Sequence, residues 1–422
     1  MHAARHCGPP PTILSMKSIA SIRSDFPLLA NSVNGKPLVY LDTAATAQKP
    51  EAVIRTVDSL HRTMNANIHR GIHYMAEETT ARYEQARERV RSLLNAASTR
   101  EIVFTSGATH SINLVAASFA EQYIQAGDNV VITEMEHHSN LVPWQLAVQR
   151  KGAELRVLPF GDAGDLQLER LPGLLDQRTR IVAVTQASNV LGTLPDLQHI
   201  IAVAHAHDIP VLVDGCQGIV HHRTDVQALD CDFYAFSGHK LYGPTGIGVL
   251  YGKEKWLDAL PPYMGGGDMV GTVRLPAGTT YAELPLKFEA GTSNYIGAIG
   301  LGAAIDYLEE LGFDDIRQHE QTLLDRLTDR LQRTIDGLRI YGTTDGKGPL
   351  VSFTVDGTHP ADIGMIVDKL GIAMRTGTHC AEPVMTHYGL TAMCRLSIGL
   401  YNTESEIDTA VAAVERAVNM LR

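Results

Sequence analysis

Short apolar runs recur through the first two thirds of the chain. Seven of them are four to six residues long, at residues 101–105, 129–133, 155–158, 181–185, 211–214, 231–236 and 246–251. Helical patterns fall between several of them, as at residues 112–123 and 197–206. This alternation predicts an α/β fold whose sheet is mainly parallel and covered on both faces. Ligands of such sheets bind beyond the carboxyl ends of the strands, so the residues after each run are candidates for chemistry.

The two ends of the chain do not share this alternation. Residues 1–16 carry a Gly-Pro-Pro-Pro stretch and little periodicity, so we expect a disordered extension. We expect residues 17–35 to form an N-terminal segment that packs with a smaller domain, and residues 36–297 to form a large domain. A long helical pattern begins at residue 298 and extends to residue 331, and short apolar runs follow it at residues 350–355, 372–374 and 395–398. Residues 298–422 are therefore predicted to form the smaller, α+β domain.

The composition excludes several classes of protein. The chain has 422 residues, of which 44% are hydrophobic, so it can bury a large core. Its formal net charge of -11 argues against nucleic acid or an anionic membrane surface as a partner. No apolar run approaches the roughly 18 residues of a membrane span, so we expect no membrane partner and a cytoplasmic location. The five cysteines show no Cys-x-x-Cys pair and no metal-like spacing, so we expect neither a metal site nor a disulfide framework.

A lysine follows the sixth apolar run in a tight turn. Ser237-Gly238-His239-Lys240 comes directly after this run, and Gly243-Pro244 then prevents a helix. Lysine amines form Schiff bases with carbonyl substrates or with pyridoxal phosphate. Most lysines, however, are solvated surface residues, so Lys240 needs partners elsewhere in the chain.

Three other apolar runs end in residues suited to a ligand. Ser106-Gly107-Ala108-Thr109 opens a helix, where free N–H groups and the helix dipole could hold a phosphate, although an ordinary N-cap explains the same residues. Asp214 ends a buried run and needs a cationic or donor partner, which a protonated pyridine nitrogen or backbone N–H groups could supply. Asp42-Thr43-Ala44-Ala45 ends the run at residues 38–41 in small residues that allow close approach.

An imidazole, a thiol and a guanidinium complete the candidates. His137 follows a strand run and could stack on an aromatic cofactor, or it could form a surface pair with His138. Adjacent histidines point in different directions, which disfavours a metal site. Cys380 lies in a loop near His and Arg, where a thiol can become a thiolate, although cysteines are more often buried and inert. Arg395 begins a strand run and could bind a carboxylate through two parallel hydrogen bonds or form a surface ion pair.

Taken together, these motifs resemble a known family. Residues 237–244, Glu136-His137-His138 and residues 375–380 (Arg-Thr-Gly-Thr-His-Cys) resemble the group II, Suf-type cysteine desulfurases of the class V aminotransferase-like family. The resemblance extends from about residue 19 to the C-terminus. It implies a fold-type I pyridoxal phosphate transferase, with a mainly parallel seven-stranded sheet in the large domain and a smaller α+β domain that carries the nucleophile.

The resemblance also implies a role for each candidate side chain. Lys240 would bind pyridoxal 5'-phosphate covalently, Asp214 would pair with the pyridine nitrogen, and Gln217 would bond the ring hydroxyl. His137 would stack on the ring and assist proton transfer. The phosphate would be held by Ala108, Thr109, Ser237 and His239, with Thr292 contributed by the other subunit of a homodimer. The substrate carboxylate would bind Asn189, Arg375 and Arg395, and Cys380 would be the nucleophile.

The implied reaction converts L-cysteine to L-alanine and leaves the sulfur as a persulfide on Cys380. A protein acceptor of the Suf system would receive this sulfur for iron–sulfur cluster assembly, and L-selenocysteine is a second implied substrate. The family often has His where this chain has Thr378, in the loop that would meet the acceptor. A selenocysteine lyase, a class V aminotransferase or an epimerase would need Lys240 and Asp214 but not Cys380. A non-catalytic, partner-binding protein would need none of them.

Overall fold

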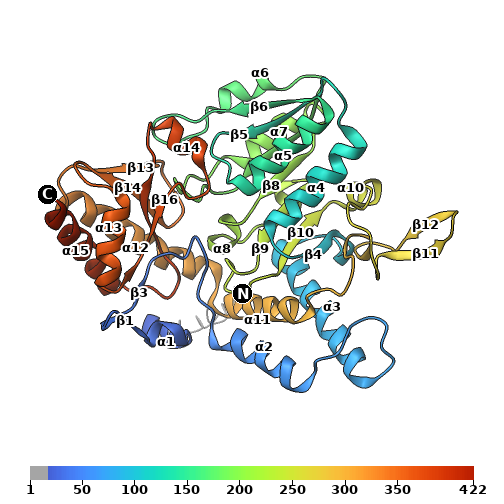
Figure 1. Ribbon diagram of the computed structural model, residues 1–422, viewed down its shortest axis with the longest axis horizontal. Helices are drawn as coiled ribbons and strands as arrows, with labels where there is room; N and C mark the ends of the chain where they lie inside the picture. The colour runs from blue at the N-terminus through green and yellow to red at the C-terminus, as the bar shows by residue number, and fades with distance from the viewer. Residues whose placement is uncertain (1–17) are drawn as a thin grey trace, which may run out of the picture.

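The computed structural model describes residues 18–422, so the predicted disordered extension at residues 1–16 lies outside the described residues. Its central sheet has seven strands in the order β4-β10-β9-β8-β7-β5-β6 (Figure 1). Their bounds are β4 Ile102–Thr105, β5 Asn129–Thr133, β6 Glu154–Leu158, β7 Thr179–Thr185, β8 Val211–Asp214, β9 Phe233–Ser237 and β10 Gly248–Gly252. The pairs β5–β6, β5–β7, β7–β8 and β8–β9 are parallel, whereas β10 is antiparallel to both β9 and β4. The predicted mainly parallel, seven-stranded sheet is confirmed.

Both faces of this sheet are buried along six of its strands, which explains why they read as nearly continuous apolar runs; the edge strand β6 is partly exposed. Along β8, Val211 and Val213 contribute to one hydrophobic cluster and Leu212 to another. The second cluster is completed by α4 (Ala108–Tyr123) and α5 (His138–Lys151). The first is completed by α3 (Tyr74–Leu94), α7 (Leu197–His205) and α11 (Tyr295–Leu311). Short helices α8 (Gly218–His221), α9 (Val226–Leu229) and α10 (Glu254–Ala259) connect the later strands.

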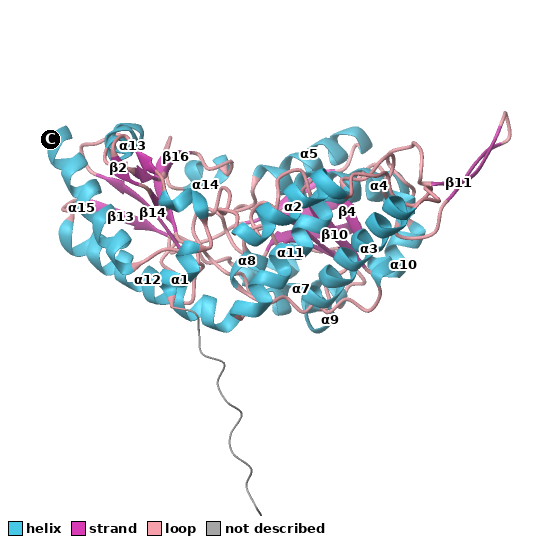
Figure 2. Cartoon of the chain, turned by 90° about the horizontal axis from the view of Figure 1, so that it is seen from below, coloured by secondary structure: helices cyan, strands magenta, loops and turns pink. Residues whose placement is uncertain are grey.

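A second, antiparallel sheet lies in the C-terminal part of the chain (Figures 1 and 2). Its strands, in the order β13-β14-β17-β16, are β13 Leu338–Tyr341, β14 Leu350–Val355, β17 Met393–Ser397 and β16 Arg375–Gly377. The helices α12 (Phe313–Thr334), α13 (Pro360–Lys369) and α15 (Glu404–Leu421) share one hydrophobic cluster with β14 and β17. The short helix α14 (Glu382–His387) follows the loop that carries Cys380.

The predicted helical region over residues 298–331 is two helices, not one. It divides between α11 and α12 at Gly312, whose φ of +84° lies in the left-handed region that glycine adopts most readily. The run at residues 372–374 also differs from expectation, because β15 (Ile372–Ala373) pairs in parallel with β3 (Val39–Tyr40) rather than with the second sheet. A C-terminal strand is thus joined to the N-terminal part of the chain.

The N-terminal segment makes further contacts with the C-terminal part. Arg23, in α1 (Ile19–Ser24), forms an ion pair with Glu406 at 2.8 Å. The Asn34 amide donates to the Asp368 carbonyl oxygen at 2.8 Å, from the turn between β1 (Ser32–Val33) and β2 (Lys36–Pro37). Outside these layers lie α2 (Glu51–Thr63), α6 (Leu171–Leu174) and a hairpin of β11 (Val270–Arg274) and β12 (Gly278–Tyr281). No helix within residues 18–422 is long and apolar enough to cross a membrane.

Candidate active site

A cavity of about 280 Å³ contains most of the residues that the sequence singled out. It lies beyond the carboxyl ends of several sheet strands and is closed by residues of the C-terminal part of the chain. Its lining includes Ala108, Thr109, His137, Asn189, Ser237, His239, Lys240, Arg375, Cys380 and Arg395. It also includes Ala44 and Ala45, the small residues expected to allow close approach, and three residues to which the sequence assigned no role, Ser139, Cys216 and His379. Asp214 and Gln217 lie next to the cavity, and Thr292 lies elsewhere.

Lys240 reaches the cavity from the turn after β9. Within residues 18–422 its amine has neither a hydrogen bond nor an ion pair, whereas its backbone N–H donates to the Ser237 carbonyl oxygen at 3.3 Å. Tyr242 closes the same turn in the left-handed conformation, with φ of +58°. The fold therefore presents an uncommitted amine in a defined turn.

The N-terminus of α4 faces the same cavity. Its N-cap is Gly107, which offers no capping side chain, and the N–H of Ala108 donates instead to Ser237 Oγ at 2.8 Å. No acceptor within the described range pairs with the N–H of Thr109. A Cβ on Gly107 would lie 3.4 Å from Ser237 Oγ, so glycine keeps this corner open. An uncapped helix N-terminus beside a serine hydroxyl is suited to an anionic group such as a phosphate.

The ring-binding candidates lie at the end of β8. Asp214 is buried, and its Oδ1 accepts the N–H of Cys216 at 3.0 Å. The Gln217 amide donates to the Ala44 carbonyl oxygen at 2.8 Å, which ties α8 to the small residues after β3. Cys216 is buried among these groups, and burial together with the Asp214 charge raises the pKa of its thiol to about 12. Cys216 is thus a neutral thiol at neutral pH.

His137 forms the N-cap of α5, and its Nδ1 accepts the backbone N–H of Ser139 at 3.1 Å. Because Nδ1 is an acceptor, the proton of the neutral ring is on Nε2. Burial, followed by the positive charge of Lys240, lowers the pKa of His137 to about 4. The preceding Glu136 is fully buried, and burial raises its pKa to about 8. A neutral imidazole at this position is suited to stacking on a ring.

Cys380 belongs to a strained loop between β16 and α14. His379 and Cys380 both adopt the left-handed conformation, with φ of +54° and +57°. The Asn189 amide donates to the His379 carbonyl oxygen at 2.7 Å, and the N–H of His138 donates to the Cys380 carbonyl oxygen at 2.8 Å. The Cys380 residue is nevertheless exposed. These contacts hold the loop against the central sheet and leave Cys380 accessible.

Arg375 and Arg395 lie opposite each other on β16 and β17. Arg395 is buried, and its Nη1 donates to the Asn189 carbonyl oxygen at 2.8 Å. Both guanidinium groups also contact Asp42, an acidic partner that the sequence did not identify as part of the site. The only sequence signal for it was its position directly after the apolar run at residues 38–41.

Thr292 does not lie in this cavity. It lines a separate cavity of about 250 Å³ that also includes Ser106, His110 and Met264. Its loop is anchored by the neighbouring Glu289, whose buried carboxylate accepts hydrogen bonds from Arg87 at 2.6 Å and from Tyr83 at 2.8 Å. Thr292 therefore contributes nothing to the active-site cavity of its own chain.

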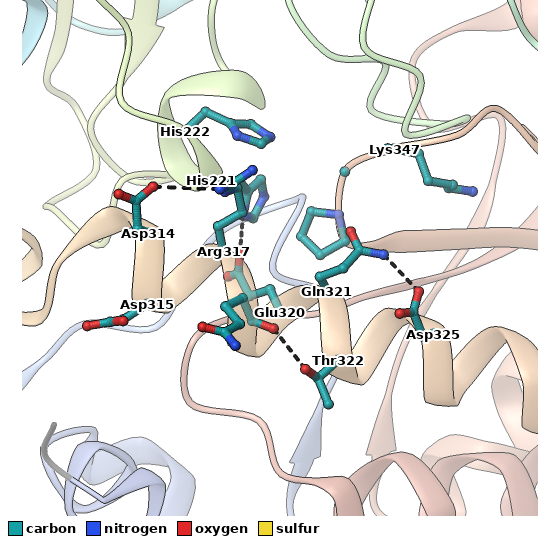
Figure 3. A pocket seen from close by; sticks show the side chains of 14 residues that line it. His221, His222, Asp314, Asp315, Arg317, Glu320, Gln321, Thr322, Asp325 and Lys347 are labelled. Carbon is teal, nitrogen blue, oxygen red and sulfur yellow. Dashed lines mark hydrogen bonds and ion pairs between the residues drawn. The ribbon is translucent and has the colours of Figure 1, made fainter.

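A larger cavity, of about 440 Å³, lies between α8 and α12 (Figure 3). It is lined by polar side chains, among them the buried ion pair of His221 Nδ1 and Glu320 Oε2 at 2.7 Å. None of the predicted site residues lines it. Volume therefore does not identify the active site, and the smaller cavity is the better candidate because it contains the amine, the thiol and the guanidinium groups.

The comparison with known proteins agrees with this geometry. The family model described as aminotransferase class-V matches residues 39–410. The chain belongs to this family. Enzymes of the family use pyridoxal phosphate, and this chain is accordingly a pyridoxal phosphate-dependent enzyme.

Within the class-V family, its similar relatives are cysteine desulfurases. The cysteine desulfurase of Cronobacter sakazakii is 52% identical over 404 residues, which cover 96% of this chain and 99% of the relative. That of Serratia proteamaculans is 51% identical over 403 residues, with the same coverage. Among solved structures, the cysteine desulfurase CsdA of Escherichia coli has a TM-score of 0.90 at 42% identity and covers 97% of this chain and 100% of its own. The apo cysteine desulfurase of Thermococcus onnurineus has a TM-score of 0.91 at 35% identity, again covering 97% and 100%.

Proposed function

We propose that this protein is a cysteine desulfurase, which converts L-cysteine to L-alanine and retains the sulfur as a persulfide on Cys380. The observation that carries the proposal is the presence of Lys240, Cys380 and the Arg375–Arg395 pair in one cavity. An amine, a thiol and a carboxylate-binding pair are the groups that desulfuration of an amino acid requires. The full-length similarity to cysteine desulfurases supports the same reaction.

The cavity fits pyridoxal phosphate. Its uncapped α4 N-terminus and Ser237 would hold the phosphate, with Thr109 and His239 beside them. Asp214 would pair with the pyridine nitrogen, Gln217 would lie near the ring hydroxyl, and His137 would stack on the ring. The uncommitted amine of Lys240 would hold the cofactor covalently. When bound, the cofactor supplies an electron-accepting ring that labilises bonds of the amino acid attached to it.

The remaining residues act on the substrate. Asn189, Arg375 and Arg395 would orient its carboxylate. The amine of Lys240 can move protons at the substrate carbon once it is displaced, and His137, which lines the same cavity, would assist. Cys380, as a thiolate, attacks the substrate sulfur: the new S–S bond forms as the C–S bond breaks, and the carbon that loses sulfur takes up a proton and becomes the methyl group of alanine. One L-cysteine and the Cys380 thiol thus yield one L-alanine and one Cys380 persulfide.

The sulfur would then leave the protein through the exposed Cys380. We propose a protein acceptor of the Suf system, delivery to iron–sulfur cluster assembly, and activity on L-selenocysteine as a second substrate. We further propose a homodimer, because Thr292 lies outside the cavity of its own chain, and a partner subunit could place the equivalent residue at the phosphate.

The variant Cys380→Ala tests the proposal. It should retain the bound cofactor, because Cys380 lies apart from the phosphate and ring contacts, but should form neither persulfide nor sulfide from L-cysteine. Alanine and persulfide are measured in parallel for the native protein and for Cys231→Ala, a matched control whose thiol is buried just before β9 begins. Undiminished sulfide release by Cys380→Ala would reject the desulfurase function and favour a lyase that breaks the C–S bond without a persulfide on Cys380.

A further inference from the structure

A carboxylate from the N-terminal part of the chain lies between the two arginines of the cavity. Asp42 Oδ1 is 3.2 Å from Arg395 Nη2, and Asp42 Oδ2 is 2.9 Å from Arg375 Nη2. Arg375 Nε donates to the same carboxylate at 3.1 Å. Asp42 therefore bridges two guanidinium groups from different strands.

The register of the second sheet explains why such a bridge is needed. Arg375 and Arg395 are directly opposite each other on antiparallel strands, and like charges at such positions repel. Burial lowers the pKa of Arg395, and the Asp42 charge opposes that effect. The hydrogen bond to Asp42 is the main cause of the raised pKa of Arg375. Asp42 thus stabilises both guanidinium groups in their charged form, side by side.

The bridge leaves one donor of Arg395 free for a ligand. Nη1 donates to Asn189 and Nη2 to Asp42, whereas Nε is buried and has no acceptor within residues 18–422. Two guanidinium groups and one carboxylate leave a net charge of +1 at the cavity wall. A single carboxylate group matches both the free donor and this charge.

We propose that Asp42 is a positioning residue that holds Arg375 and Arg395 in the orientation that binds the α-carboxylate of the substrate. The inference rests on the proposed desulfurase function. Asp42 does not itself line the cavity, so it acts through the two arginines. It reaches them from the segment after β3, which is fastened to the C-terminal part of the chain by the pairing of β3 with β15.

The holoenzyme variant Asp42→Asn tests this role, because an amide is uncharged and its one oxygen cannot serve both arginines. We expect the KM for L-cysteine and the Kd for L-alanine to rise about tenfold, the loss of one charge-assisted hydrogen bond. Binding of cysteamine, which has the amine and thiol of cysteine but no carboxylate, should change less than about twofold on the same scale. Binding is followed through the absorbance of the bound cofactor.

Asp408→Asn is the matched control, because Asp408 pairs with Arg326 at 2.6 Å on the outer helices α12 and α15, away from the cavity. It should alter neither ligand. If Asp42→Asn weakened L-alanine and cysteamine equally, its role would be structural, and if L-alanine bound more tightly, Asp42 would be a competitor; either result overturns the inference. Should Asp42→Asn not fold, Asp42→Glu is the second variant, because it keeps the negative charge but displaces it. We expect it to weaken the binding of L-alanine and not that of cysteamine. An equal weakening of both ligands would again overturn the inference. A native protein that binds L-alanine but does not desulfurate L-cysteine would instead reject the proposed function.

Discussion

The backbone N–H of His138 donates to the carbonyl oxygen of Cys380 at 2.8 Å, joining the first turn of α5 to the Cys380 loop. In return, His138 Nε2 accepts the N–H of Glu382 at 3.2 Å, on the other side of the cysteine. His137 lines the cavity with Lys240, and its neighbour His138 therefore holds the loop of Cys380. In this way the fold links the amine and the thiol through one helix N-terminus.

The conformation of the Cys380 loop should matter more for activity than for stability. Gly377, the last residue of β16, leads into this loop with φ of +123°. No atom lies within 4 Å of the position of a Cβ, so Gly377→Ala adds backbone strain of about 1–3 kcal/mol without a clash. We expect a lower kcat for persulfide formation with unchanged cofactor binding. Gly357→Ala is the control, because Gly357 also has a positive φ, of +74°, and open space at the Cβ position, but it follows β14 instead of leading into the Cys380 loop. Equal kcat losses in both variants would contradict a specific role of the loop.

Replacement of Lys240 should abolish covalent attachment of the cofactor. Lys240→Ala removes the only lysine amine in the cavity lining, so we expect the absorbance of the lysine-bound cofactor to disappear and alanine production to fall below detection. Absorbance spectroscopy of the purified protein checks the first result. Lys255→Ala, an exposed lysine near Trp256, should behave as the native protein. A Lys240→Ala protein with an unchanged spectrum would contradict the assignment.

Breaking the buried ion pair that anchors the Thr292 loop should destabilise the protein strongly, because it leaves one buried charge without its partner. Arg87 and Glu289 are both 1% exposed and 2.6 Å apart, so Arg87→Met leaves a buried carboxylate without its cation. We expect the free energy of unfolding to fall by about 3–5 kcal/mol. Arg62→Met, which removes an exposed ion pair with Asp58, should lower the free energy of unfolding far less. Urea unfolding measures both values, and similar losses would show that burial is not decisive.

Acid should destabilise the protein through its buried histidines. Burial, followed by the Arg395 charge, lowers the pKa of His379 to about 3, below the value of about 6.5 in an unfolded chain. The unfolded state then binds the proton first, so the contribution of His379 is complete above pH 6.5 and is lost as the pH falls towards 3. We expect His379→Leu to reduce the difference in unfolding free energy between pH 7 and pH 5. His207 lies on an exposed turn, so the control variant His207→Leu should leave the difference between pH 7 and pH 5 unchanged. An unchanged difference in His379→Leu would contradict the prediction.

Much of the framework of the site follows from local sequence patterns. The apolar runs predicted all seven strands of the central sheet, because burial on both faces leaves few polar positions in six of them; only the edge strand β6 is partly exposed. Parallel strands bring their carboxyl ends to one edge, so the residues after each run could be expected to meet. Lys240 and His137 line one cavity beyond these ends, and Asp214 lies beside it.

Other features were decided only by the tertiary structure. The position of Thr292 outside the cavity and the pairing of β15 with β3 have no signature in a local pattern. The contacts of Asp42 with Arg375 and Arg395 join positions more than 330 residues apart, and no local sequence motif reports such a contact. The amino-acid sequence by itself determined the strands, the reactive residues and their order. The partners of those residues were decided by tertiary packing, because periodicity reports whether a residue is buried, whereas only the folded chain determines which distant side chain it contacts.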